Sequence, residues 1–281
     1  MGMMNIGASG MSAQSVKLNT ISNNIANSDT LSYKAQRVNF AEAYVAAGGQ
    51  RASGNILQNG TGVSVASTNA DWSNGAMETT NEPSNLMLSG DGFFLVSLNN
   101  ETYYTRAGDF SLVANPSGDG YVLMRPNGAV LTGYDAAAGT YGDIAFTGYD
   151  STGAVVDLAP SSYTIASDGS ITAQPDAASD PYIQVSNGNI RIQRFNNPDS
   201  LVRTEEGLYQ PTVETSYNTT APVTPGEDGS GTVLQGALEG SNTDLITEFT
   251  NMIGSQRAFQ ANSKVITTAD ELLQTVMNMK R

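Results

Sequence analysis

Apolar residues recur at helical spacing toward both ends of the chain and in short clusters between them. Toward the N-terminus an apolar residue returns every seven positions, with one more on the same face: Met4, Met11, Leu18, Ile21 and Ile25. This spacing is typical of a helix that packs against other helices. It predicts a helix from about Met3 to Asn27.

The predicted N-terminal helix is intrinsically weak. Gly2, Gly7 and Gly10 each lower its stability by roughly 1 kcal/mol relative to Ala. Lys17 is the only charged residue among the first 28, so few ion pairs support the helix. Such a helix needs a partner, and two alternatives follow. It is the buried first helix of a single globule, or it becomes ordered only on assembly.

The C-terminal pattern predicts a stronger helix from Leu245 to Arg281. Ser241 and Asp244 fit a capping box with Ser241 as the N-cap. At 1.5 Å per residue the helix spans roughly 55 Å, too long for a compact domain of this size to cover. We therefore predict bundle or coiled-coil packing, through the N-terminal apolar residues and these C-terminal ones: Leu245, Phe249, Met252, Ile253, Phe259, Ile266, Leu272, Leu273 and Val276.

The middle of the chain has a sequence pattern typical of β-structure. Short apolar runs alternate with turn sequences, and they predict strands at Gly92–Val96, Tyr121–Met124 and Gly188–Ile192. Stretches rich in Gly, Ser, Asn and Thr, at Ala46–Thr61 and Thr215–Gly231, predict linkers or extended arms.

The predicted fold class is therefore α+β, with long terminal helices and a central, mainly β domain. The predicted division has three parts: a helical assembly domain at 1–30 and 241–281, bridging segments at 31–75 and 212–240, and a central β domain at 76–211.

The amino-acid composition excludes most classes of catalytic site. The 281 residues include no His and no Cys, which excludes His-based triads, thiol nucleophiles, disulfides and the usual zinc sites. Adjacent carboxylates occur at Glu205-Glu206 and Asp270-Glu271, but a glycosidase needs two carboxylates that converge in a cleft. We expect no enzyme activity, metal or cofactor.

Charge is distributed unevenly. The net charge of −14 separates into +1 for residues 1–50, −15 for residues 51–240 and zero for residues 241–281. This argues against nucleic-acid binding, which needs a basic surface. One interpretation is an ordinary acidic domain kept soluble by its charge. The other is that near-neutral ends face a partner while the acidic middle faces solvent.

No targeting or membrane segment is visible. The first residues lack a basic n-region and an apolar core, so we expect no cleaved signal peptide. No run of 18 apolar residues exists, and we expect no membrane insertion.

Four ordered sequence blocks resemble the bacterial flagellar rod and hook proteins. The first block, at 22–34, resembles the family's N-terminal signature, with Ser32 at a position where the family usually has Gly. The second and third, at 89–94 and 104–110, resemble the start of its β domain. The fourth comprises 238–245 and 251–264 and resembles its C-terminal signature. The signature residues in these blocks are Asn23, Asn24, Ala26, Asn27, Tyr33, Lys34, Gly90, Gly92, Phe93, Ser241, Asn242, Gln256 and Arg257.

The resemblance implies a structural subunit that polymerises into a helical tube, with paired terminal helices on the inside and the β domain outside. It also implies export through the flagellar type III apparatus, and neighbouring rod, hook and junction proteins as partners.

Within the family, Leu131–Tyr134 resembles a hook protein, whereas the insert Val45–Gln58 resembles one associated with the stiff rod. We predict a hook subunit, the universal joint of the flagellum, with a distal rod subunit as the alternative. A secreted β-rich adhesin is the alternative from another class.

Overall fold

The computed structural model describes residues 2–50, 56–116, 118, 120–135, 139–149, 155–156, 162–174, 182–204, 207–212 and 221–279. The chain divides into two compact units. The helical unit comprises Met1–Asp29, Lys34–Ser73 and Asn242–Arg281, and the β-rich unit comprises Thr30–Tyr33 and Asn74–Ser241.

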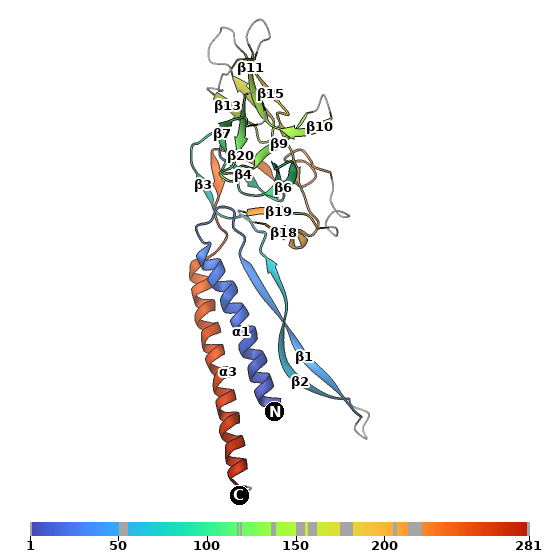
Figure 1. Cartoon of the computed structure of the whole chain (residues 1–281), viewed down its shortest axis with the longest axis vertical. Helices are drawn as coiled ribbons and strands as arrows, with labels where there is room; N and C mark the ends of the chain where they lie inside the picture. The colour runs from blue at the N-terminus through green and yellow to red at the C-terminus, as the bar shows by residue number, and fades with distance from the viewer. Residues whose placement is uncertain are drawn as a thin grey trace. The chain divides into compact units, whose positions relative to one another are not determined.

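Two antiparallel helices and a long hairpin make up the helical unit (Figure 1). Helix α1 spans Gly2–Ala26 and packs along helix α3, which spans Leu245–Met279. Strands β1 (Gln36–Gln50) and β2 (Ile56–Ala70) pair antiparallel, with register shifts that indicate bulges. The expected pairing of the N- and C-terminal helices is confirmed. The segment predicted as an extended arm, Ala46–Thr61, lies at the tip of this hairpin, and its residues 51–55 fall outside the described residues.

One large antiparallel sheet, built from strands of different lengths, dominates the β-rich unit. The predicted central β-structure is confirmed. Its main path runs β12-β11-β8-β9-β5-β6-β19-β18 through antiparallel neighbours. The strands of this path are β5 (Phe93–Leu98), β6 (Glu101–Thr105), β8 (Tyr121–Met124), β9 (Val130–Asp135), β11 (Ala145–Tyr149), β12 (Val155–Val156), β18 (Val202–Arg203) and β19 (Leu208–Gln210).

Shorter strands pair with this path or with each other. They are β3 (Met77–Thr79), β4 (Leu86–Ser89), β7 (Ser111–Ala114), β10 (Thr140–Asp143), β13 (Ser162–Ile165), β14 (Ile171–Gln174), β15 (Tyr182–Ser186), β16 (Asn189–Ile190), β17 (Ile192–Gln193), β20 (Thr232–Gln235) and β21 (Ala237–Glu239). A 3₁₀ turn, η1, spans Pro198–Ser200. Leu86, Phe94, Phe110, Phe146 and Ile190 form the centre of the core.

Two local expectations need correction. The predicted strand Gly188–Ile192 is interrupted at Arg191 and forms two short strands, β16 and β17, that pair with different neighbours. The N-cap of α3 is Asp244 rather than Ser241. The Asp244 carboxylate accepts hydrogen bonds from the Ile246 amide at 3.0 Å and the Thr247 hydroxyl at 2.6 Å. Leu245 is thus the first helical residue, and the capping residue stands directly before it.

Candidate assembly interface

Small residues let the two helices of the helical unit approach closely. A methyl group at Gly7 would lie 2.8 Å from Ile266 Cγ1, and one at Gly10 would lie 2.7 Å from Asn262 Nδ2. Ala13 on α1 and Ser255 and Ala269 on α3 are also buried. Two of the three glycines that weaken the isolated helix are therefore residues that fit it against α3.

The signature residue Asn24 joins α1 to the hairpin and to α3. Its side-chain amide donates to the Gln36 carbonyl at 2.9 Å, and its oxygen accepts from the Gln36 amide at 2.9 Å. The same amide group lies 3.2 Å from Glu248 Oε1 on α3. Asn24 is 1% exposed, so these bonds satisfy a buried polar side chain that would otherwise be costly.

A second signature asparagine plays a similar part from the other end of the chain. Asn242 accepts from the Ala35 amide at 2.8 Å and donates to the Asp71 carbonyl at 2.8 Å. Beside it the fully buried Lys34 donates to the Ser73 carbonyl at 2.7 Å. These bonds tie the start of β1 and the residues after β2 to the residues before α3.

The apolar residues predicted for assembly differ in exposure. On α1, Ile21 is buried and the rest of the stripe is half-buried. On α3, Met252 and Ile266 are half-buried, whereas the remaining predicted residues are exposed: Leu245, Phe249, Ile253, Phe259, Leu272, Leu273 and Val276. Large apolar side chains gathered on one exposed element are a common feature of surfaces that bind another protein.

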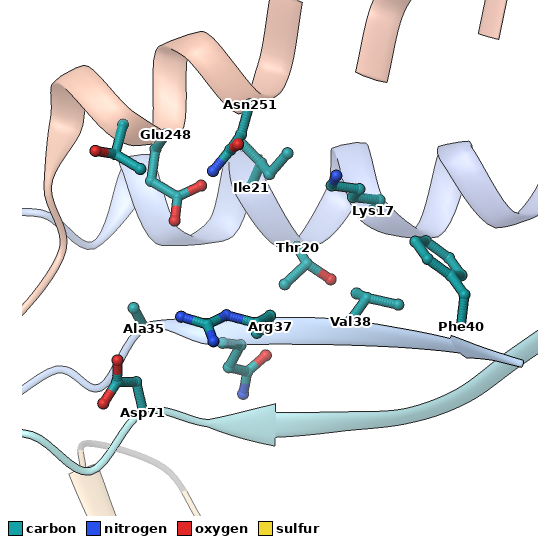
Figure 2. A pocket seen from close by; sticks show the side chains of 12 residues that line it. Lys17, Thr20, Ile21, Ala35, Arg37, Val38, Phe40, Asp71, Glu248 and Asn251 are labelled. Carbon is teal, nitrogen blue, oxygen red and sulfur yellow. The ribbon is translucent and has the colours of Figure 1, made fainter. Parts of the chain in front are cut away.

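A groove of about 350 Å³ lies in the helical unit, between α1, the start of β1 and the start of α3. Figure 2 shows its two ends. Lys17 lies beside Phe40 and Val38 at one end, and Glu248 and Asp71 lie at the other.

The Glu248 end of the groove also contains Arg37, and its two carboxylates are held by internal bonds. Hydrogen bonds from the Ser73 backbone and side chain, which outweigh the desolvation that opposes them, hold the pKa of Asp71 below its usual value. Glu248 accepts from Asn24.

The β-rich unit contains the remaining buried signature residues. Gly92 has a φ of 135°, and a methyl group there would lie 2.1 Å from Ile192 Cγ2. Gly90 also has a positive φ, of 116°. Phe93 is buried, and the Arg106 guanidinium lies 5.6 Å from its ring centre. Tyr33 is buried under Arg203, at 5.1 Å. Backbone geometry and burial therefore account for these residues.

Ser32 adopts the backbone conformation that glycine favours. Its φ is 53°, in the left-handed region. Its amide donates to the Glu239 carbonyl at 2.8 Å, and its hydroxyl donates to the Arg106 carbonyl at 3.0 Å. The hydroxyl bond offsets part of the cost of a side chain in this conformation.

Sequence reasoning missed a buried ion pair in the β-rich unit. Arg106 Nη1 and Glu239 Oε1 lie 3.6 Å apart, and both side chains are almost fully buried. Arg106 also donates to Asn74 Oδ1 at 3.0 Å and to the Gly90 carbonyl at 2.7 Å, and Glu239 accepts from the Gly75 amide at 3.0 Å. Both residues lie in sequence blocks that resemble the family. Their place in these blocks is the one feature of the sequence that could have marked them as important.

Other signature residues lie on the surface or in turns. Asn27 is half-buried and donates to the Asn23 carbonyl at 2.9 Å, which closes the end of α1. Ser241 is half-buried just before α3. The exposed signature residues are Asn23, Ala26, Gln256 and Arg257.

Among the described residues, the candidate carboxylates do not form a catalytic site. Asp270 and Glu271 are exposed on α3. Glu205 and Glu206 lie outside the described residues. Across the part of the chain that the structure describes, no group of three or more acidic side chains could hold a metal ion.

Comparison with known protein families places three matches along the chain. Residues 4–34 match the flagella basal body rod protein family, and residues 87–173 match the D1 domain of the flagellar hook proteins FlgE/F/G. Residues 234–279 match the C-terminal family of the flagellar basal body rod FlgEFG proteins.

Relatives extend the similarity over the whole chain. The flagellar basal-body rod protein FlgG of Bacillus subtilis is 35% identical over 98% of this chain and 97% of its own length. FlgG of Borreliella burgdorferi is 31% identical over the same shares. The chain belongs to the flagellar hook and basal-body rod protein family.

Membership of the flagellar hook and rod family agrees with the resemblance found in the sequence. The hook protein FlgE of Rhizobium meliloti is 26% identical over the full chain. The matched families and relatives are structural flagellar proteins, so the chain is a structural component of the flagellar hook or basal body and not an enzyme. Neither described helix is long and apolar enough to cross a membrane.

Proposed function

We propose that the chain is a distal rod subunit of the flagellar basal body that polymerises into a straight helical tube. The near-full-length similarity to FlgG rod proteins carries this proposal. The alignment with the FlgE hook protein extends over 415 residues, so that protein is considerably longer than these 281 residues. The comparisons thus favour the rod alternative over the hook subunit predicted from sequence.

The hairpin supports the same choice. The insert Val45–Gln58 resembles one associated with the stiff rod, and its described residues, 45–50 and 56–58, belong to the paired strands β1 and β2. Paired strands are stiffer than a Gly/Ser-rich coil, because each strand restricts the other. A paired arm in this position suits a rigid tube.

Self-assembly is supported by the exposed apolar residues of α3. Phe249 is 50% exposed and Ile253 is 52% exposed on one face of the helix. In the proposed tube, coiled-coil or bundle contacts with other copies cover this face. Neighbouring rod, hook and junction proteins are the proposed partners at the ends of the tube. We also propose export through the flagellar type III apparatus.

Phe249→Asp tests self-assembly. The side chain is exposed in the single chain, so the variant is expected to fold and to remain monomeric at concentrations where the unmodified protein polymerises. Sedimentation velocity measures both the compactness of the variant and its association state. Thr267→Asp is the matched control, since it adds the same charge at an exposed residue of α3 whose neighbours one turn away, such as Lys264 and Glu271, are polar. Polymerisation of Phe249→Asp equal to that of the control would contradict the proposal.

A further inference from the structure

The C-terminal end of α3 has no described partner within the chain. The antiparallel register places Gly7 beside Ile266, and it carries α3 past the described part of α1 (Figure 1). Every residue from Glu271 to Met279 is exposed. We call residues 270–279 the overhang. A helix end this short and unpacked is marginal in water by itself.

One face of the overhang continues the face that packs on α1. Ile266 lies against α1, and Asp270, Leu273 and Met277 follow it at intervals of four, three and four residues. Leu273 is 45% exposed and Met277 is 72% exposed. The overhang therefore presents an acidic residue followed by two large apolar side chains, on a face that is covered elsewhere along the helix.

The groove described above presents the complementary chemistry. Val38 and Phe40 line its Lys17 end. Ile21 lies toward Asn251, and the groove's second basic side chain, Arg37, points toward Glu248 and Asp71. Lys17 forms no hydrogen bond or ion pair with any described residue, whereas Glu248 at the opposite end is bonded to Asn24. A basic side chain beside apolar walls suits an acidic residue followed by apolar ones.

The overhang cannot reach the groove of its own chain. The groove contacts α3 at Thr247–Asn251, and a straight helix places Leu272 about 30 Å from Asn251. Any overhang that enters the groove must come from another molecule.

We propose that the overhang of one copy docks into the groove of a second copy, with Asp270 facing Lys17 and with Leu273 and Met277 against Phe40 and Val38. This inference rests on the proposed self-assembly and names the surfaces that perform it. Each copy carries one overhang and one groove at different places, so the contact is heterologous. Repetition of a heterologous contact that does not close generates an open helical polymer.

A charge exchange tests the contact. Lys17→Glu places two acidic residues opposite each other, and Asp270→Lys places two basic residues opposite each other. Each variant alone is expected to raise the critical concentration for polymerisation about tenfold, since an attraction becomes a repulsion. An equimolar mixture of the two variants is expected to polymerise near the original concentration, because each groove then meets an overhang of opposite charge.

Glu271→Lys is the matched control. It makes the same change of charge one residue further along α3, on a face that continues through Thr275 and Asn278. We expect no more than a twofold change in critical concentration.

Sedimentation velocity at equal ionic strength separates the outcomes. Weakened single variants with a restored mixture support the contact. Single variants that polymerise like the unmodified protein would overturn it, and so would a mixture that fails to restore polymerisation. If the unmodified chain stays monomeric at every concentration, the proposed self-assembly itself fails, and the docking contact fails with it.

Discussion

Asn24 and Gln36 exchange two hydrogen bonds of 2.9 Å each, between the buried side-chain amide of Asn24 and the backbone N–H and C=O of Gln36. The pair copies the geometry by which two strands exchange bonds, but it joins the last turn of α1 to the first residue of β1. A side chain with both a donor and an acceptor is required there, which accounts for an amide at this signature position.

Asn24→Asp is expected to loosen the start of β1. A carboxylate can accept from the Gln36 amide but cannot donate to its carbonyl, and it faces Glu248 as a second acidic group. We expect a loss of about 2–4 kcal/mol in local stability. Hydrogen exchange at Gln36 and neighbouring amides measures it. Asn19→Asp, an exposed position on the same helix, is expected to leave this exchange unchanged.

Gly7→Leu tests the close approach of the two helices. Leucine is a far better helix former than glycine, yet its side chain would collide with Ile266. We expect a net loss of about 1–3 kcal/mol in the stability of the helix pair, seen as faster amide exchange in α1. At Gly2, where a methyl group would meet nothing within 4 Å, the same substitution should not speed exchange. Equal protection in the two variants would contradict the small-residue interface.

Glu239→Gln is expected to destabilise the β-rich unit. It leaves the buried Arg106 guanidinium without its counter-charge, at a cost of about 3–5 kcal/mol. Urea unfolding followed by exchange of β5 and β6 amides measures the loss. Glu227→Gln makes the same chemical change at an exposed position and should be neutral within about 0.5 kcal/mol. A neutral Glu239→Gln variant would mean that the pair contributes little.

The first turn of α3 is expected to depend on pH. A hydrogen bond from the Thr247 hydroxyl, followed by one from the Ile246 amide, holds the pKa of Asp244 below its ordinary value of 3.8. A lowered pKa in the folded state means that the cap stabilises the helix above pH 4 and loses this effect as the pH falls through the lowered pKa.

Amide exchange at Ile246 and Thr247 between pH 3 and 6, corrected for intrinsic rates, measures this effect. Asp244→Asn retains a capping acceptor without a titrating group, and it should remove the pH dependence. Persistence of the same pH dependence in that variant would rule out Asp244 as its source.

Periodicity was enough to predict both helices, and the resemblance to the flagellar rod and hook proteins implied that they pair. The ends of α1 and α3 lie within two residues of the expected ones, where both are described. The sequence also indicated Ser32 as unusual, and its positive φ explains why glycine suits that position. The α3 cap was wrong because Ser241 and Asp244 both fit capping patterns. Asp244 caps the helix because it stands directly before the first helical residue.

Contacts between distant segments could not be predicted from one sequence. Nothing in the order of residues indicates that Arg106 meets Glu239, because strand pairing and chain reversal bring them together. The glycines of α1 were counted as weaknesses because propensity describes an isolated helix. Their role depends on Ile266 and Asn262, more than 250 positions away. The exposed α3 residues could be selected by spacing, but their lack of a partner within the chain emerged only from the fold.

Electron microscopy of the concentrated, unmodified protein shows whether the chain forms a rod. We expect tubes, because the α3 of each copy exposes large apolar side chains, and we expect these tubes to be straight, as a rod subunit requires. Curved tubes would contradict the rod assignment and favour the hook. Monomers at every concentration, with no tubes in the field, would contradict self-assembly itself.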